Sequence, residues 1–257
     1  QMPALELYAD VPEVGRALAH LREATATVNE DPRAAVHAYD HVDRTDAVVD
    51  ADVAWLRLAL PWEIRDTDWA RPTMAAEHRV LDNRASTTGS SLFAAIRHHR
   101  RAHEALDRGD YQAAADGSRQ GIAAALDVGA TFFVHFNLIT LPQALSQSGD
   151  NPAHDLGLIA SALVMQRDAG QVADQWLLIS GTAGILYRHG QTELGRDVLC
   201  GMLKSPWDSG APATRRLAIV LGVDVEDYVD AESVPDLDQL VDRTLAAIDE
   251  LLDRNSS

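Results

Sequence analysis

The chain has 257 residues and a formal net charge of −17, with 46% hydrophobic residues but only 5% aromatic ones. So acidic a surface repels phosphate groups, which argues against direct binding of nucleic acid and of anionic lipid. The single cysteine, Cys200, excludes an internal disulfide. No apolar run approaches the ~20 residues that a membrane-spanning helix needs, and we see no signal-peptide pattern. We therefore expect a cytoplasmic protein that does not bind membranes.

In chain order, the spacing of apolar residues first predicts two pairs of helices, residues 12–28 with 32–42 and residues 52–65 with 69–82. The stretch from Asn83 to Ser91 is rich in Ser, Thr and Gly, and predicts a loop between helical pairs. Pro61 and Pro142 fall inside expected helices, and each should kink its helix because proline lacks a backbone donor.

The third pair has the clearest signals. Apolar residues at spacings of three and four predict a helix from Ser91 to Asp107. Gly109 can adopt the left-handed geometry that ends this helix, and Asp110 is placed to cap the next one, which runs to about Asp127. Further pairs are expected at 130–147 with 152–168 and at 172–189 with 192–204.

The turn inside these pairs recurs about every 40 residues, beginning at residues 31, 68, 110, 150 and 191. Periods of ~20–50 residues are typical of solenoids, in which each repeat stacks on its neighbours. The pattern predicts an all-α, right-handed α-solenoid of about five helical hairpins over residues 5–204.

Residues 205–257 do not follow this period. After a turn-rich break at 205–212, we expect a short helix at 213–221. Ser233 and Pro235 then predict the start of a last amphipathic helix that reaches about Asp253. We interpret this tail as the cap that a solenoid needs at its end.

The third turn, Gly109-Asp110-Tyr111 followed by Ala114, resembles the turn of tetratricopeptide repeats (TPR). In that family a small residue precedes the glycine by seven positions, where the two helices touch, and Ala102 occupies this place. Gly190 and Ala183 match the same spacing in the fifth hairpin, whereas Pro142 departs from it in the fourth. The resemblance covers residues 12–204 and implies a TPR-like helical repeat.

The whole arrangement, tail included, resembles the C-terminal helical-repeat region of actinobacterial LuxR-type and SARP-type transcription regulators, and of ATPases and cyclases of similar layout. This resemblance implies a bacterial regulatory domain in transcription control and signal transduction. It also implies a fragment of a larger regulator, unless Gln1-Met2 is a tag remnant before a native start.

One polar cluster provides candidate binding residues. His99 and His103 lie four positions apart, and in the tetratricopeptide register both fall on the concave face. With Arg97 and Arg101 they could bind a carboxylate of a partner peptide, and Phe136 and Tyr187 could serve as apolar anchors.

Three functional hypotheses follow. The first is a non-enzymatic domain for protein–protein interaction and regulation, without metal or cofactor, whose concave face binds a protein, a peptide or another part of the same polypeptide. The second is a small-molecule sensor with an apolar pocket near Phe132–Phe136, although core packing also explains these residues. The third is an enzyme, which would need a metal at His99 and His103.

Overall fold

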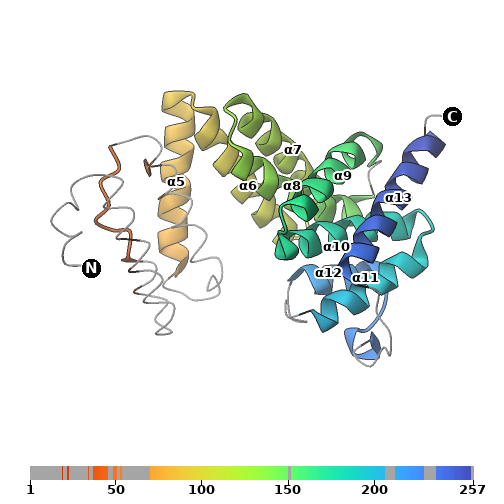
Figure 1. Cartoon of the computed structure of the whole chain (residues 1–257). Coiled ribbons are helices and arrows are strands. Elements are labelled where there is room, and N and C mark those ends of the chain that lie inside the picture. The colour runs from red at the N-terminus through yellow and green to blue at the C-terminus, as the bar shows by residue number, and fades with distance from the viewer. Residues whose placement is uncertain are drawn as a thin grey trace. The chain divides into compact units, whose positions relative to one another are not determined.

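The computed structural model describes residues 70–149, 152–205, 212–228 and 236–255, together with residues 19, 22, 34, 37–45, 49–50 and 53. All regular elements in this part are helices, which confirms the all-α prediction (Figure 1). The α-helices are α5 (Ala70–Thr88), α6 (Ser91–Asp107), α7 (Tyr111–Asp127), α8 (Thr131–Ser148), α9 (Ala153–Asp168), α10 (Val172–Arg188), α11 (Thr192–Lys204), α12 (Pro212–Leu221) and α13 (Leu237–Asn255), and η1 (Val225–Tyr228) is a 3₁₀-helix.

The chain divides into two compact units, Gln1–Arg97 and His98–Ser257. Most of the predicted helices 12–28 and 52–65, and Pro61, lie outside the described residues. Of the predicted helix 32–42, residues 34 and 37 are helical and residues 38–41 form a turn. The predicted division at residue 204 stays a prediction. None of the helices that the structure describes combines the length and the apolar character that crossing a bilayer requires.

In the first unit, α5 corrects the loop predicted from Asn83 to Ser91, because the helix continues to Thr88. The hydroxyls of Ser86, Thr87 and Thr88 donate hydrogen bonds to backbone carbonyls four residues earlier, at 2.7 to 2.8 Å. Side chains that turn back to the helix in this way need not end it. The connection to α6 is thereby reduced to Gly89 and Ser90.

Ion pairs join Arg44 and Asp50, which precede α5 in the chain, to side chains of α5. Arg44 Nε lies 2.6 Å from Asp50 Oδ1, and Arg44 Nη1 lies 3.3 Å from Glu77 Oε2. Arg84 Nε is 2.9 Å from the other oxygen of Asp50. Since Asp50 and Glu77 are buried, their charges depend on these arginines for compensation.

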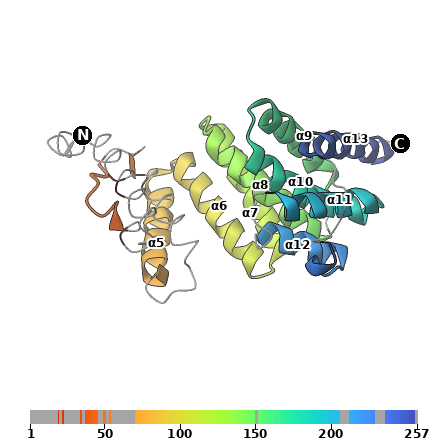
Figure 2. The ribbon, with the colours of Figure 1, turned by 60° about the horizontal axis from the view of Figure 1, so that its bottom comes forward.

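The second unit is built around α8 and α10. Residues 137–146 of α8 and 178–186 of α10 are all buried, and we call these two stretches the interior seam. Helix α10 packs against α8, α9, α11, α12 and α13. Figure 2 shows α9 and α13 on one side of α10 and α12 on the other. A helix covered on all sides needs small or apolar residues all around, which α10 provides.

Close approach in the interior seam depends on Gly181. A Cβ added there would lie 2.6 Å from the backbone nitrogen of Gln143 and 2.7 Å from the carbonyl carbon of Pro142. Side chains never approach backbone atoms so closely, so only glycine lets α10 contact α8 here. Helix α8 continues through Pro142, as its bounds show.

The turns between helices follow the predicted chemistry. Gly109 has a φ of 76°, the left-handed conformation expected of it, and Asp110 Oδ1 accepts a hydrogen bond of 3.2 Å from the backbone nitrogen of Ala113. Ala102 packs against α7 at Gly117, where a small residue lets the two helices approach. These local signals explain why the predicted bounds of α6 to α11 lie within one residue of the observed ones.

An ion pair with a buried carboxylate joins α7 to α9. Arg119 Nη2 lies 2.9 Å from Asp155 Oδ2, and the Asp155 side chain is only 2% exposed. The hydrogen bond to this carboxylate raises the pKa of the Arg119 guanidinium. The pair joins the two helices through a charge-assisted hydrogen bond.

Helix α13 packs against α9, α10 and α11. The residues that it buries are Leu240, Val241, Thr244, Ala247, Ile248 and Leu251. Asp236 caps the helix by accepting a hydrogen bond of 2.8 Å from the backbone nitrogen of Gln239. Ser233 and Pro235, predicted to begin this helix, lie outside the described residues.

Candidate interaction surface

Aromatic rings of α6 and α8 form a continuous row. The ring centroid of His99 lies 4.7 Å from that of His103 and 5.6 Å from that of Phe136. Phe136 in turn lies 4.7 Å from Phe132, which contacts Phe133 at 5.1 Å. We call the four residues His103, His99, Phe136 and Phe132 the aromatic row. Three of the six residues predicted as a binding site are thus brought together.

The inner part of the aromatic row is buried. His99 is 1% exposed. Burial, together with the nearby His103 and Arg100, holds the pKa of His99 well below its usual value. The imidazole is therefore neutral near pH 7. It cannot provide positive charge for binding a carboxylate, which is the role that the sequence had suggested.

The two predicted arginines do not share a face with the histidines. Successive helical residues differ by about 100°, so Arg101 points about 200° away from His99, its neighbour two positions earlier. Accordingly, Arg101 is exposed while His99 is buried, and Arg97 is half-buried and belongs to the first unit. Arg101 and His99 therefore point to different sides of α6, and the role of the four residues in binding a partner stays a prediction.

Tyr187, the remaining predicted anchor, has a role in helix packing. Its hydroxyl donates a hydrogen bond of 3.2 Å to the backbone carbonyl of Leu221, which joins α10 to the end of α12. The ring also packs against Gly195 on α11. Tyr187 therefore connects three helices near the C-terminal end of α10.

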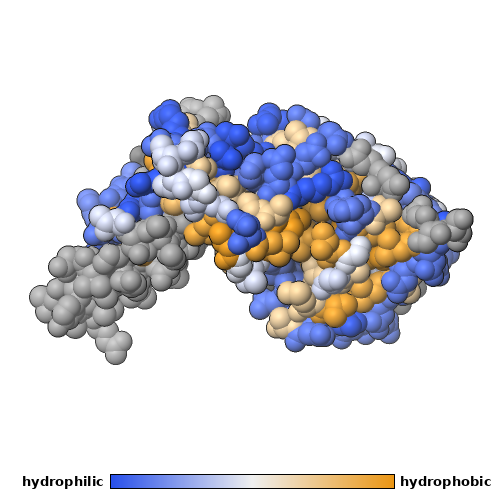
Figure 3. All heavy atoms as spheres, turned by 90° about the horizontal axis from the view of Figure 1, so that it is seen from above, coloured by the Kyte–Doolittle hydropathy of each residue, from blue (hydrophilic) through white to orange (hydrophobic). Residues whose placement is uncertain are grey.

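The outer end of the aromatic row reaches the surface at Phe132, the first phenylalanine of α8, which is 52% exposed. Figure 3 shows apolar side chains gathered between polar ones over the helices of the second unit. An exposed aromatic ring of this kind is a frequent anchor in protein–protein interfaces.

A polar network lies one helical turn further along α8, and the sequence analysis missed it. Gln166 Nε2 lies 2.7 Å from His135 Nδ1, and His135 Nε2 lies 2.9 Å from Asp174 Oδ2. The side-chain nitrogen of Gln175 also donates a hydrogen bond of 3.3 Å to the carbonyl of Gln166. Since Gln166 and Asp174 are separated from His135 by 31 and 39 positions in the chain, no local spacing could have revealed these contacts.

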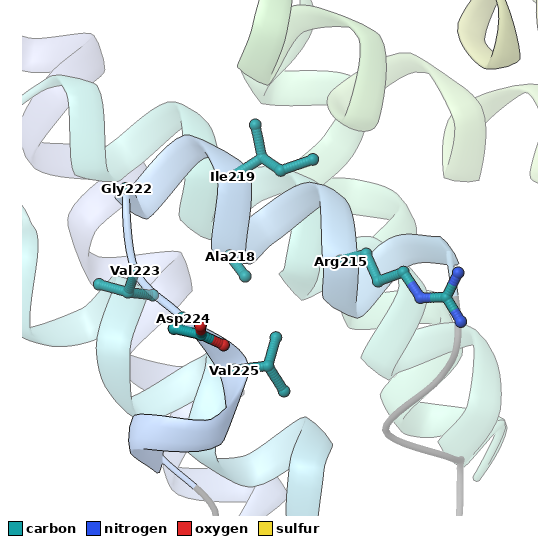
Figure 4. A pocket seen from close by; sticks show the side chains of 7 residues that line it. All are labelled: Arg215, Ala218, Ile219, Gly222, Val223, Asp224 and Val225. Carbon is teal, nitrogen blue, oxygen red and sulfur yellow. The ribbon is translucent and has the colours of Figure 1, made fainter.

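A pocket of about 440 Å³ opens between α12 and η1. It is lined by Arg215, Ala218, Ile219, Gly222, Val223, Asp224 and Val225. Figure 4 shows Ala218 on the side of α12 that faces Val225, whereas Ile219 points to the opposite side. The walls are mainly apolar, with one guanidinium and one carboxylate that could orient a small molecule.

The described residues offer little for metal or thiol chemistry. They include no group of three or more His, Cys, Asp or Glu side chains that could hold a metal ion. Burial raises the pKa of the Cys200 thiol, which disfavours the reactive thiolate.

Comparisons with models of protein families, with curated proteins and with solved structures gave no match. Functional inference therefore depends on the surface, the interior and the charge of this chain.

Proposed function

We propose that this chain is a non-enzymatic domain for protein–protein interaction and regulation, which binds a protein or peptide on its surface. In this proposal the second unit is part of a right-handed α-solenoid of about five hairpins, with α13 as its cap, and the row-forming faces of α6 and α8 line the concave side. The recurring glycine turns and the packing of α8 against both α7 and α10 support that arrangement.

The observation that carries the proposal is the half-exposed ring of Phe132 at the end of a buried aromatic row. A ring held by Phe133 and Phe136 loses little side-chain freedom when a partner covers it, so the entropic cost of binding is small. Such fixed aromatic side chains are typical anchors of interfaces.

The resemblance to bacterial transcription regulators provides the biological setting of the proposal. The partner would be a separate protein or another domain of the same polypeptide, in the cytoplasm. With a net charge of −17, this chain would not contact the nucleic acid itself, because phosphate is repelled.

A photo-crosslinking experiment in cells tests the proposal. A benzophenone derivative of phenylalanine would replace Phe132 in one variant and Asp249, an exposed residue of α13, in a matched control. We expect a covalent adduct with a defined polypeptide at position 132 and none at position 249. If neither position yields a polypeptide adduct, the proposed function is wrong.

The pocket between α12 and η1 favours a second candidate, a small-molecule sensor. Its volume of about 440 Å³ falls in the usual range of ligand sites, roughly 300–1,000 Å³. The sequence placed such a pocket near Phe132–Phe136, whereas this one lies at Ala218 and Val225. A metabolite that raises the melting temperature of the protein but not of an Ala218→Trp variant would support this candidate.

A further inference from the structure

Exposed apolar side chains are concentrated in two turns of the second unit. Among the described residues, seven large apolar side chains are exposed, and five of them lie at the α7–α8 turn or at the α9–α10 turn. We call these five the apolar rim: Leu126 (60% exposed), Val128 (47%), Phe132 (52%), Met165 (63%) and Val172 (46%). The other two exposed residues are Leu158 and Ile219.

The polar network around His135 places the two turns side by side. His135 lies three residues after Phe132, Gln166 follows Met165, and Asp174 lies two residues after Val172. Because the His135 ring lies within 2.9 Å of both Gln166 and Asp174, the ends of α8, α9 and α10 meet under the apolar rim. The first turns of α8, which carry Phe132, therefore lie beside the α9–α10 turn, which carries Met165 and Val172.

The network also fixes the geometry of this region. His135 is largely buried, with 17% of its side chain exposed, and it contacts residues of two other helices. A surface whose supporting helix ends are held in this way is organised before a partner arrives, which lowers the cost of binding. The apolar rim thus differs from single exposed apolar residues, which need no explanation.

The charge around the rim is negative. Asp127, Asp168 and Asp174 lie within the two turns, which contain no lysine and one arginine, Arg167. Arg167 Nη1 lies 2.7 Å from Asp242 on α13 and its Nε lies 4.0 Å from Asp168, so its single positive charge faces two carboxylates. Two copies of this chain would bring acidic rims together, and anionic lipid or nucleic acid would be repelled. Charge complementarity therefore favours a basic partner.

We propose that the apolar rim binds a basic amphipathic helix of a partner protein, with apolar side chains on the rim and Lys or Arg near the surrounding aspartates. A partner strand is disfavoured because the described residues include no sheet edge on which it could add, whereas an amphipathic helix presents apolar side chains on one face. This inference rests on the proposed function, since it specifies where and with what chemistry the protein partner binds.

The test uses fluorescence anisotropy with three labelled peptides of about 18 residues, roughly five helical turns. The first has leucines at helical spacing among lysines, the second has glutamates in place of the lysines, and the third is a scrambled version of the first. We expect the full-length protein to bind the basic amphipathic peptide, at least about tenfold more tightly than the scrambled one, and not to bind the acidic one.

Variants locate the binding site. Met165→Asp should weaken binding of the basic peptide at least about tenfold, because it puts a charge in the apolar contact. Ile219→Asp, which changes an equally exposed residue on α12, should leave the affinity within about twofold. Asp168→Asn should weaken binding moderately and reduce its salt dependence. Circular dichroism confirms that each variant is folded.

Three outcomes would overturn the inference. The first is that the Met165→Asp variant binds the basic peptide as tightly as the wild type does. The others are that the acidic or scrambled peptide binds as tightly as the basic one, or that the basic peptide does not bind. None of them would overturn the proposed function by itself. If position 132 still forms an adduct with a polypeptide in cells, the protein binds a partner of different chemistry or at a different place. If no adduct forms either, both proposals fail together.

Discussion

The interior seam and the apolar rim belong to the same unit, yet they differ in how closely their residues are packed. In the interior seam, Gly181 has no room for a single methyl group. At the apolar rim, Met165 leaves 63% of its surface in solvent, two residues after the fully buried Leu163. One region specifies how the helices pack, and the other leaves apolar surface available. Stability should therefore depend on the first and binding on the second.

The largest expected effect is at the ion pair between Arg119 and the buried carboxylate of Asp155. Arg119→Met keeps much of the side-chain stem but leaves the Asp155 carboxylate buried without its partner, so we expect a loss of about 3–5 kcal/mol in the free energy of unfolding. Urea denaturation measures it. The matched control is Arg167→Met, which breaks the exposed pair with Asp242 and should cost less than about 1 kcal/mol. Equal losses of stability in the two variants would contradict the distinction between a pair with a buried carboxylate and an exposed pair.

The second prediction concerns close packing in the interior seam itself. Gly181→Ala should cost about 1–3 kcal/mol, because the new methyl meets the backbone of α8 and the helices must move apart. Gly157→Ala on α9 is the control, since an added Cβ there has no atom within 4 Å. It should stabilise the protein by about 0.5–1 kcal/mol, because alanine favours a helix. A destabilised Gly157→Ala variant would count against the described packing of α9.

The third prediction follows from the buried His99. Because its pKa is lowered in the folded protein, the unfolded chain takes up a proton first as the pH falls below about 6.5. Stability is therefore fully present above that pH and is lost below it, by at most about 1.4 kcal/mol per pH unit from this group. Denaturation of the wild type and of His99→Phe between pH 8 and pH 5 should show a shallower slope in the variant.

The control for that slope is His189→Gln, which removes an exposed imidazole just after α10. Its pH dependence should match that of the wild type. An unchanged slope in His99→Phe would show that other groups determine the response to acid.

The smallest effect on stability is expected at the apolar rim. Met165→Asp should change the free energy of unfolding by less than about 0.5 kcal/mol, because the side chain is exposed. Leu163→Ala on the same helix should cost about 2–5 kcal/mol, because it leaves a cavity. Similar losses in the two variants would mean that Met165 contributes to the core and not to an available surface.

The sequence predicted the helices of the second unit well, because glycine and aspartate specify helix ends through local backbone chemistry. It failed at Asn83 to Thr88, where the hydroxyls of Ser and Thr bond back to the helix instead of ending it. Helix propensity alone does not tell whether such a hydroxyl bonds to a carbonyl within the helix or to a backbone group that ends the helix.

The candidate site was predicted in part. The pairing of His99 with His103 follows from their spacing, and Phe136 does join them. Arg101 and His99 are two positions apart, so they point to different sides of α6, and a shared role in binding stays a prediction. The apolar rim could not be predicted, since exposure at Leu126 or Met165 depends on which neighbouring helices cover each turn.

The contacts of His135 have a spectroscopic consequence. Its Nδ1 lies 2.7 Å from the side-chain nitrogen of Gln166, and its Nε2 lies 2.9 Å from a carboxylate oxygen of Asp174. The two ring nitrogens therefore face different chemical groups, and their ¹⁵N resonances should differ in chemical shift. His135 therefore provides a built-in NMR probe beneath the rim, which can follow ligand titration without any attached label.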